Sequence, residues 1–330
     1  FLFIFILLFV FKNMDSSEFS VFWGIKNINS NKIVTTGFKY SYLFLFNQDK
    51  CSNFLCPSGA GSEIFYPVRN NVLSVGLNYN KQLSNCRFKI EYGESRKQIG
   101  SYDIDFYTFP YTGYKPFNFD NLFYRKDSIY VWNNYIVFNK SESSIKQKYY
   151  NLEFRYTIEL YQYLDFILKI NYERENYYLF DAFNPYIKLF INTNVHFLYN
   201  DYYIIGSGFS FPILKLKNLK IKSGILFLLG ILHFDFYHPL RYLEFVGDNI
   251  GNGYELFLNM NFNINKKSSI IIEFRKEKFY TLTPKFAHGT EIRKYSVVEI
   301  QNVIASGGRG PEFQIHKEIF SGSIYYEFKL

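Results

Sequence analysis

The sequence predicts an all-β protein: a ten-stranded antiparallel transmembrane β-barrel with short periplasmic turns and long extracellular loops. Three observations predict it. Apolar and polar side chains alternate along segment after segment, which is the period of a strand. Short turns and long connections also alternate along the chain, as they do in outer-membrane barrels. Finally, the chain ends on a strand, residues 319–330, with one apolar and one polar face, as expected where such a barrel closes.

Composition agrees with this fold. The chain has 39 Phe and 31 Tyr, and aromatic residues reach 22%, yet the mean hydropathy is slightly negative. A soluble core would have to hide most of these rings, whereas a barrel wall presents them to lipid. An A+T-rich genome also enriches Phe and Tyr, so the prediction depends on periodicity. The net charge of +8 is spread among acidic residues without a dense basic stripe, so we expect no nucleic-acid partner.

The first residues have the character of an export signal. Residues 1–11 are almost wholly Phe, Leu and Ile, too few to cross about 30 Å of hydrocarbon as a helix but typical of a signal-peptide core. We therefore expect a signal peptide over residues 1–16 and a single outer-membrane barrel domain over residues 17–330. After export, Cys51 and Cys56 could pair within one loop, whereas Cys86 lies a whole strand further on.

The strands are expected in order along the chain. Their approximate ranges are 18–46 with a bend after 28, 62–81, 86–97, 152–160, 166–173, 202–216, 221–232, 254–264, 270–277 and 319–330. In the fourth strand, Leu152 and Phe154 face one way while Glu153 and Arg155 face the other, and such a charged face suits a barrel lumen. A long irregular segment is expected at 98–148, and long connections are expected at 180–201, 233–253 and 281–311. Within the connection 180–201, residues 187–197 are an alternative strand extension above the membrane.

Two clusters of titratable residues are expected at the same end of the barrel. Asp103 and Asp105 follow the third strand, and a spacing of two aims both carboxylates at one face, where such a pair tends to share a proton. Asp235 and His238 follow the seventh strand, and a carboxylate that orients an imidazole makes a general base. From spacing alone, a solvated loop accounts better for the Asp pair, and an extracellular aromatic rim accounts better for His238. The other four histidines, His196, His233, His288 and His316, form no ligand spacing.

The sequence resembles the omptin family of outer-membrane proteases along nearly the whole mature chain. The resemblance rests on short motifs in matching order: Asp103-Ile104-Asp105-Phe106, Phe211 to Leu216, His238 with Arg241 and Phe245, Ser306-Gly307-Gly308, and Tyr325 to Phe328. It implies a ten-stranded barrel whose extracellular mouth holds an Asp-x-Asp pair facing an Asp-His dyad, with a water between them as nucleophile. No metal or organic cofactor is implied.

The chain also departs from the family pattern. The family's dyad Asp stands two residues before the His, where this chain has Phe236, so a one-residue bulge would be needed to bring Asp235 to the ring. Phe234 replaces an acidic residue with which the family reads basic substrates, so that preference is not carried over. Tyr172 matches a residue with which the family holds lipid A, but the positions after it are rearranged, so dependence on lipopolysaccharide is not carried over either.

The resemblance thus implies an aspartyl-type endopeptidase in the outer membrane of a diderm bacterium, with its active site facing outside. Asp103 and Asp105 would polarise a water, His238 would take its proton, and Asp235 would support the imidazolium. The partners would be outer-membrane lipid and extracellular peptides or proteins, and we expect a monomer. Two other classes stay open: a non-catalytic barrel acting as an adhesin, small pore or surface scaffold, for which Phe236 argues, and a soluble exported β-sandwich.

Overall fold

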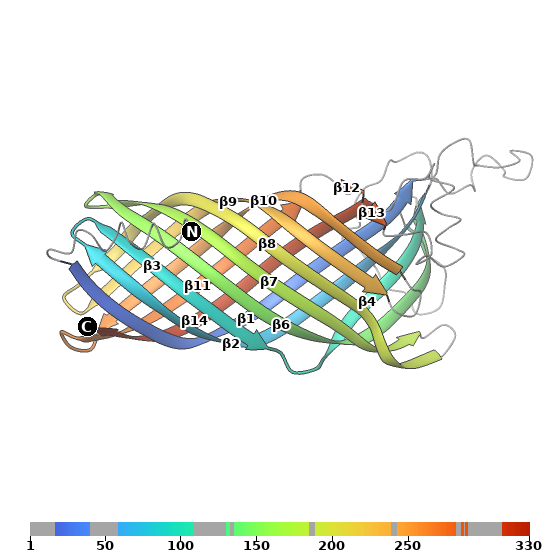
Figure 1. Cartoon of the computed structure of the whole chain (residues 1–330), viewed down its shortest axis with the longest axis horizontal. Coiled ribbons are helices and arrows are strands. Elements are labelled where there is room, and N and C mark those ends of the chain that lie inside the picture. The colour runs from blue at the N-terminus through green and yellow to red at the C-terminus, as the bar shows by residue number, and fades with distance from the viewer. Residues whose placement is uncertain are drawn as a thin grey trace, which may run out of the picture.

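The structure is a closed antiparallel β-barrel. The computed structural model describes residues 17–39, 59–108, 130–132, 135–184, 189–238, 243–281, 285–286, 288–289 and 312–330. Long tilted strands run from an end with tight turns and the C-terminus to an end with longer connections (Figure 1). We call these the turn end and the loop end. In the described part of the chain, no helix is long and apolar enough to cross a membrane.

The strands follow the chain order around the wall. They are β1 Ser17–Lys39, β2 Gly59–Lys81, β3 Ser84–Glu94, β4 Gln98–Thr108, β5 Tyr130–Trp132, β6 Tyr135–Tyr161, β7 Leu164–Asn184, β8 Leu189–Lys215, β9 Leu219–His238, β10 Leu243–Asn263, β11 Ser268–Thr281, β12 Lys285–Phe286, β13 His288–Gly289 and β14 Glu312–Lys329. The wall closes because β1 pairs with β14 on one side and with β2 on the other. The short strands β5, β12 and β13 pair at its edge near the loop end.

Eleven of the described strands form the ring, but the wall is ten strands wide. Both β3 and β4 pair with β2 on one side and β6 on the other, so they are the lower and upper parts of one wall strand. Gly100 lies at the start of the upper part, at an irregularity in the β4–β6 register, with a φ of 121° that favours glycine. The predicted ten-stranded antiparallel barrel is confirmed.

The two faces of the wall differ as the alternation predicted. Toward the turn end, outward side chains form an apolar belt: Trp23, Ile25, Leu73, Val75, Leu77, Ile90, Leu152, Leu168, Ile170, Ile205, Phe227, Leu229, Ile231, Leu256, Phe274, Phe320 and Ile324. Nearer the loop end the outward positions become polar, for example Asn71, Arg174, Asp201 and Glu318. The strands therefore continue well beyond the belt on the loop side.

Four predicted boundaries were wrong, all on the loop side of the belt. The expected connections 98–148, 180–201 and 233–253 consist largely of strand, in β4, β6, β7, β8, β9 and β10. Also, β1 runs through residues 28–33 without the expected bend. In these segments, both faces carry large side chains, so the contrast between apolar and polar positions disappears while the backbone pairing continues. Residues 1–16, Cys51 and Cys56 lie outside the described residues.

Candidate active site

The predicted acidic pair lies on β4 at the loop end of the lumen. Asp103 is buried on the inner face, opposite Ile64 of β2. Two residues earlier, the Ser101 hydroxyl donates a hydrogen bond to the Phe65 carbonyl oxygen at 2.6 Å, which ties this stretch to β2. Pairing with β2 is unbroken from Tyr102 to Thr108, so positions 103 and 105 belong to the same face of β4. The side chain of Asp105 is outside the described residues.

A histidine that the sequence analysis set aside meets Asp103. His196 projects from the inner face of β8 and is buried, with 1% of its surface exposed. Its Nε2 atom lies 3.8 Å from Oδ2 of Asp103. Because β6 and β7 separate β4 from β8 in the wall, this contact crosses the lumen. It joins a carboxylate and an imidazole, the two groups from which a general base is built.

Register irregularities flank both members of this pair. On β8, the partner of Leu179 is His196 and the partner of Phe180 is Asn194, so Val195 is an extra residue directly before the histidine. On β6, a shift occurs opposite Asp105, where Asn139 is followed by Val137 in the pairing with β4. Such bulges bend a strand and redirect the next side chain, and they are frequent beside active sites.

Aromatic side chains enclose the pair. The ring of Phe236, buried on the inner face of β9, packs edge-on against His196 with 5.2 Å between ring centroids. Tyr66 of β2 is buried nearby, and burial raises the pKa of its hydroxyl well above the usual value, with a further contribution from the charge of Asp103. The tyrosine thus stays a neutral hydrogen-bonding group at any physiological pH.

The second predicted cluster, Asp235 with His238, does not lie on one face of β9. Around residue 235, β9 pairs with both β8 and β10 without a register shift. Phe234 and Phe236 fill the inner face, and Asp235 is half-buried on the outer face opposite Tyr199. The bulge that would have brought Asp235 to the inner side is absent from the described register, and residues three apart in a regular strand point to opposite faces.

His238 is the last residue of β9, and its side chain is outside the described residues. Its backbone position is nevertheless informative. Continuing the register by one residue beyond the pair Phe197 and Tyr237 sets position 238 beside His196. The structure therefore brings Asp103 and His196 together, and His238 directly follows Tyr237, the partner of Phe197 on β8, while Asp235 lies on the outer face of the wall.

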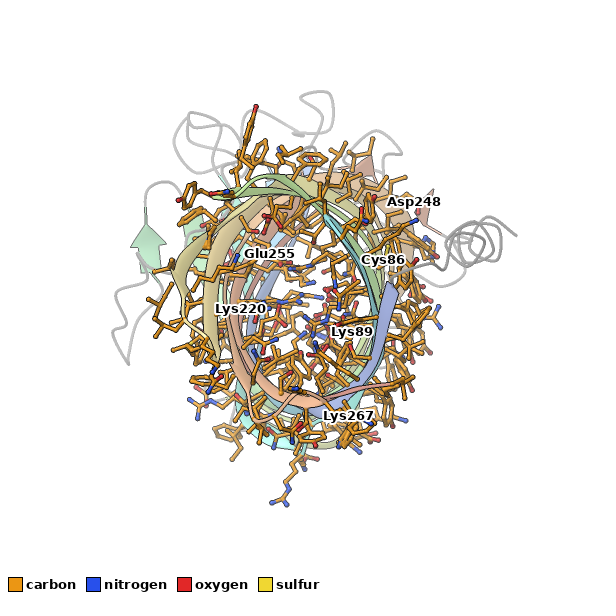
Figure 2. The ribbon with its side chains drawn as sticks, turned by 90° about the vertical axis from the view of Figure 1, so that its left-hand side faces the viewer. Cys86, Lys89, Lys220, Asp248, Glu255 and Lys267 are labelled. Carbon is orange, nitrogen blue, oxygen red and sulfur yellow. The ribbon has the colours of Figure 1, made fainter. Side chains whose placement is uncertain are left out.

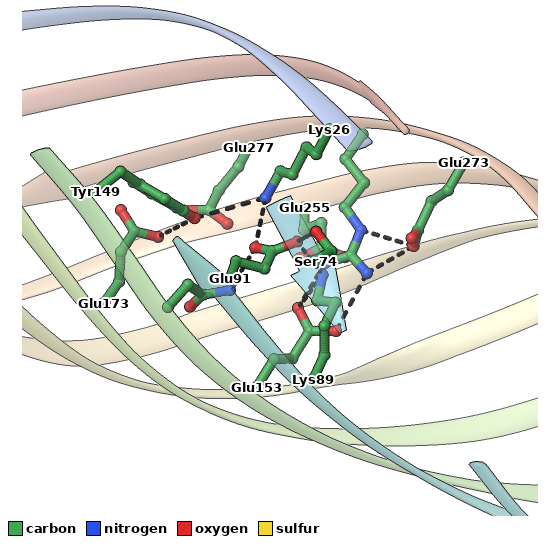
Figure 3. Close-up of polar contacts among 12 residues, drawn as sticks. Lys26, Ser74, Lys89, Glu91, Tyr149, Glu153, Glu173, Glu255, Glu273 and Glu277 are labelled. Atoms are coloured by element: carbon green, nitrogen blue, oxygen red, sulfur yellow. Dashed lines mark hydrogen bonds and ion pairs between the residues drawn. The ribbon is translucent and has the colours of Figure 1, made fainter. Parts of the chain in front are cut away.

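The lumen below this site is filled. A large apolar cluster follows first, including Tyr66, Tyr177, Leu198, Phe234 and Phe279. Next comes a network of ion pairs, and Figure 3 shows the part of it around Lys26, Lys89, Glu91, Glu153 and Glu273. In this network, Arg155 Nη2 lies 2.7 Å from Glu255 and Lys169 Nζ lies 2.5 Å from the same carboxylate. Further pairs join Arg275 to Glu153 and Glu273, Lys26 and Lys89 to Glu91, Lys317 to Glu173, and Lys32 to Glu175.

Within the described ranges, no three His, Cys, Asp or Glu side chains gather as a metal site would require. The chemistry available from the described groups is proton transfer between a carboxylate and an imidazole in a largely water-excluded mouth. His196 escaped the sequence analysis because its acidic partner lies on a different strand and its own segment was assigned to a connection. Residues 196, 198, 200 and 202 alternate in burial, but the sequence carries no matching signal, because both sets of alternate positions mix polar and aromatic residues.

Comparison with known proteins supports the fold. No family model and no curated protein matches the chain. Among solved structures, the outer membrane protease OmpT from Escherichia coli gives a TM-score of 0.53 at 8% identity, over 96% of this chain and 99% of that one. The translocator domain of autotransporter NalP from Neisseria meningitidis gives 0.35 at 7% identity, over 93% and 88%. The toluene transporter TodX from P. putida gives 0.29 at 6% identity, over 97% and 91%.

At these identities the likeness shows the fold alone, and of these three only OmpT has a TM-score above 0.5. That likeness spans both chains almost completely, and it agrees with the ten-strand wall and the turn and loop ends described above. This chain therefore has the fold of the outer-membrane β-barrels, and the predicted fold class is confirmed.

Proposed function

We propose that the chain is an omptin-like outer-membrane endopeptidase that hydrolyses peptides or proteins at the cell surface. The observation that carries the proposal is the contact between Asp103 and His196 at the loop end of the lumen, 3.8 Å between Oδ2 and Nε2. OmpT, whose barrel is similar, is described as a protease, and we extend that activity to this chain as part of the proposal.

The apolar belt supports the membrane part of the proposal. Its outward Leu, Ile, Val and Phe side chains suit hydrocarbon, and the tyrosines at its loop-side border suit the interface. These tyrosines pack in tilted cross-strand pairs, Tyr92 with Tyr150 and Tyr172 with Tyr203, at centroid distances of 5.1 and 5.2 Å. The turn end would face the periplasm and the loop end the outside, as in outer-membrane barrels generally.

In the proposed mechanism, a histidine at the mouth takes a proton from a water that attacks the peptide carbonyl. Asp103 then stabilises the imidazolium that forms on His196, the role that the sequence had suggested for Asp235. We keep Asp105 as the second carboxylate, since it shares the face of Asp103, and His238 as the second histidine, since it directly follows the paired residues Phe197 and Tyr237 in the β8–β9 register. No step requires a cofactor.

The test is cleavage of a mixed peptide library by the refolded full chain, with and without lipopolysaccharide. We expect Asp103→Asn and His196→Gln each to lower the rate by at least about a hundredfold. His238→Gln, measured beside them, decides which histidine is the base. Asp235→Asn is the matched control, since this carboxylate lies on the outer face. Full activity in both Asp103→Asn and His196→Gln would overturn the proposal.

A second candidate function is a non-catalytic barrel that binds partners at the cell surface. The specific observation in its favour is Phe236, whose ring covers one side of His196 at the position where the omptin family carries an aspartate. If the refolded wild type cuts no peptide under any of these conditions, this reading replaces the first. An open pore is disfavoured by the filled lumen, and a planar-bilayer recording without conductance steps would agree with that.

A further inference from the structure

A partly open cavity lies in the lumen at the turn end, away from the candidate active site. Its volume is about 450 Å³. Figure 2 looks into the barrel from this end, with Lys220, Lys89 and Glu255 labelled inside the ring of strands. The cavity is lined by Glu18, Asn78, Asn80, Asn85, Arg87, Arg155, Thr157, Asp165, Ile167, Ser210, Lys220, Lys222, Phe257, Asn259, Asn261, Asn263, Ile271, Glu327 and Lys329. The proposed function makes no use of it.

Cationic groups dominate this lining. It contains the side chains of five basic and three acidic residues. Two of the basic groups are neutralised at the rim: Lys222 Nζ lies 2.7 Å from Asp165, and Lys329 Nζ lies 2.9 Å from Glu18. Among the described residues, Lys220 has no carboxylate within ion-pair distance.

The deeper basic groups have unused hydrogen-bond donors. The side chain of Arg87 is 8% exposed and its guanidinium stacks on Phe22 and Tyr325, at 4.4 and 5.1 Å from the ring centroids. One of its terminal nitrogens is 3.6 Å from Glu273, but Nε and Nη2 have no acceptor within the described part of the chain. The equally buried Arg155 gives Nη2 to Glu255, whereas its Nε likewise lacks an acceptor there.

One carboxylate in the lining, Glu327, is already engaged. The carboxylate of Glu327 accepts hydrogen bonds from Ser20 at 2.6 Å, Asn78 at 2.5 Å and Ser269 at 2.7 Å. A buried donor left without a partner costs about 1–3 kcal/mol, and a guanidinium presents its donors as a planar fork that matches carboxylate and phosphate oxygens. The cavity thus offers Nε and Nη2 of Arg87 and Nε of Arg155, three buried donors without an acceptor among the described residues.

We propose that this cavity is a binding site for a small oxyanion, a carboxylate or phosphate carried on a polar solute that enters from the turn end. Arg87 and Arg155 hold the anionic group at the buried floor, and Lys220 attracts it at the exposed rim. The asparagine amides, each of which can donate and accept, bind the polar remainder of the solute. This site is independent of the proposed peptidase activity.

The experiment is calorimetric titration of the refolded full chain with two probes, inorganic phosphate and citrate, against a chloride control at equal ionic strength. We expect saturable binding of at least one probe, and the stronger one tells whether phosphate or carboxylate is preferred. Lys220→Gln is expected to weaken binding by about three- to tenfold, and Arg87→Gln by more than about tenfold. Lys267→Gln, on the turn between β10 and β11 and outside the cavity lining, is the matched control and should bind like wild type.

Because Arg87 is buried, Arg87→Gln can fail to fold, and in that event the comparison of Lys220→Gln with Lys267→Gln decides alone. Absence of saturable heat with both probes at millimolar concentration overturns the proposal. The same holds if Lys220→Gln and Lys267→Gln bind alike, because the binding is then not in the cavity. A crystal structure grown with the stronger probe that shows only water on the Arg87 guanidinium would also overturn it.

Discussion

His196 and Asp103 are joined across the lumen, 3.8 Å between Nε2 and Oδ2, although neither strand touches the other in the wall. The contact exists because the barrel closes, and the extra residue Val195 on β8 redirects the strand directly before His196. Asp103 and His196 each lie on a strand that is paired on both sides in a closed barrel. They are therefore held more rigidly than two side chains on one loop. Rigidity of this kind is what a positioned general base needs.

The ring of Phe236 gives the first prediction. It packs on His196 from the inner face of β9, so Phe236→Asp would set a second carboxylate beside the imidazole. We expect peptide hydrolysis to rise about tenfold or more, because a charged partner stabilises the imidazolium that forms in the transition state. Phe236→Asn, of the same size but uncharged, is the control. Equal rates in both variants would mean that Phe236 limits the reaction only by its volume, or not at all.

The ion-pair network gives the second prediction. Glu255 neutralises Arg155 and Lys169, and all three side chains are buried. Glu255→Gln keeps the shape but leaves two buried cations short of a partner, so it should lower the free energy of unfolding by about 3–5 kcal/mol. Urea unfolding in lipid, followed by tryptophan fluorescence, measures this.

The control for that experiment is Glu318→Gln. Glu318 lies on the outer face, is 41% exposed and pairs with Lys276 at 3.0 Å. An exposed pair contributes about 0–1 kcal/mol. If both variants lose the same stability, the lumen network is not the main electrostatic support of the barrel.

Much of the fold was predictable because lipid and lumen impose opposite demands on alternate residues. From Leu152 to Leu160 each outward position is apolar, and the charges of Glu153 and Arg155 enter the lumen network. Beyond the belt that contrast is lost. Tyr177 and Leu179 face inward while Tyr178 lies on the other face, so neither period nor polarity revealed that the strand continues.

The site was less predictable for a related reason. Local spacing singled out Asp103, because a pair two residues apart is visible in the sequence. The contact with His196 is non-local, and it depends on the extra residue Val195, which has no sequence signature of its own. For Asp235 the bulge had to be assumed, and the observed register of β9 contains none at that point.

Glu63 gives the third prediction. This carboxyl lies on β2, on the loop side of the apolar belt, and is fully buried, and burial raises its pKa to about 9. The folded chain keeps the proton that the unfolded chain releases above its ordinary pKa of 4.5. The contribution of Glu63 to the free energy of unfolding is therefore fully present below about pH 4.5. It is lost progressively as the pH rises toward about 9.

The variant Glu63→Gln removes this dependence, since the amide is neutral at every pH. It should be more stable than wild type at pH 7, by about 3 kcal/mol at most, and the difference should vanish near pH 4. Glu94→Gln is the control with the opposite sign, because hydrogen bonding to Lys146 lowers the pKa of Glu94. Urea unfolding midpoints across this pH range measure both. A Glu63→Gln variant that tracks wild type at all pH values would show that the folded state ionises Glu63 normally, through water reaching it or through a cation beside it.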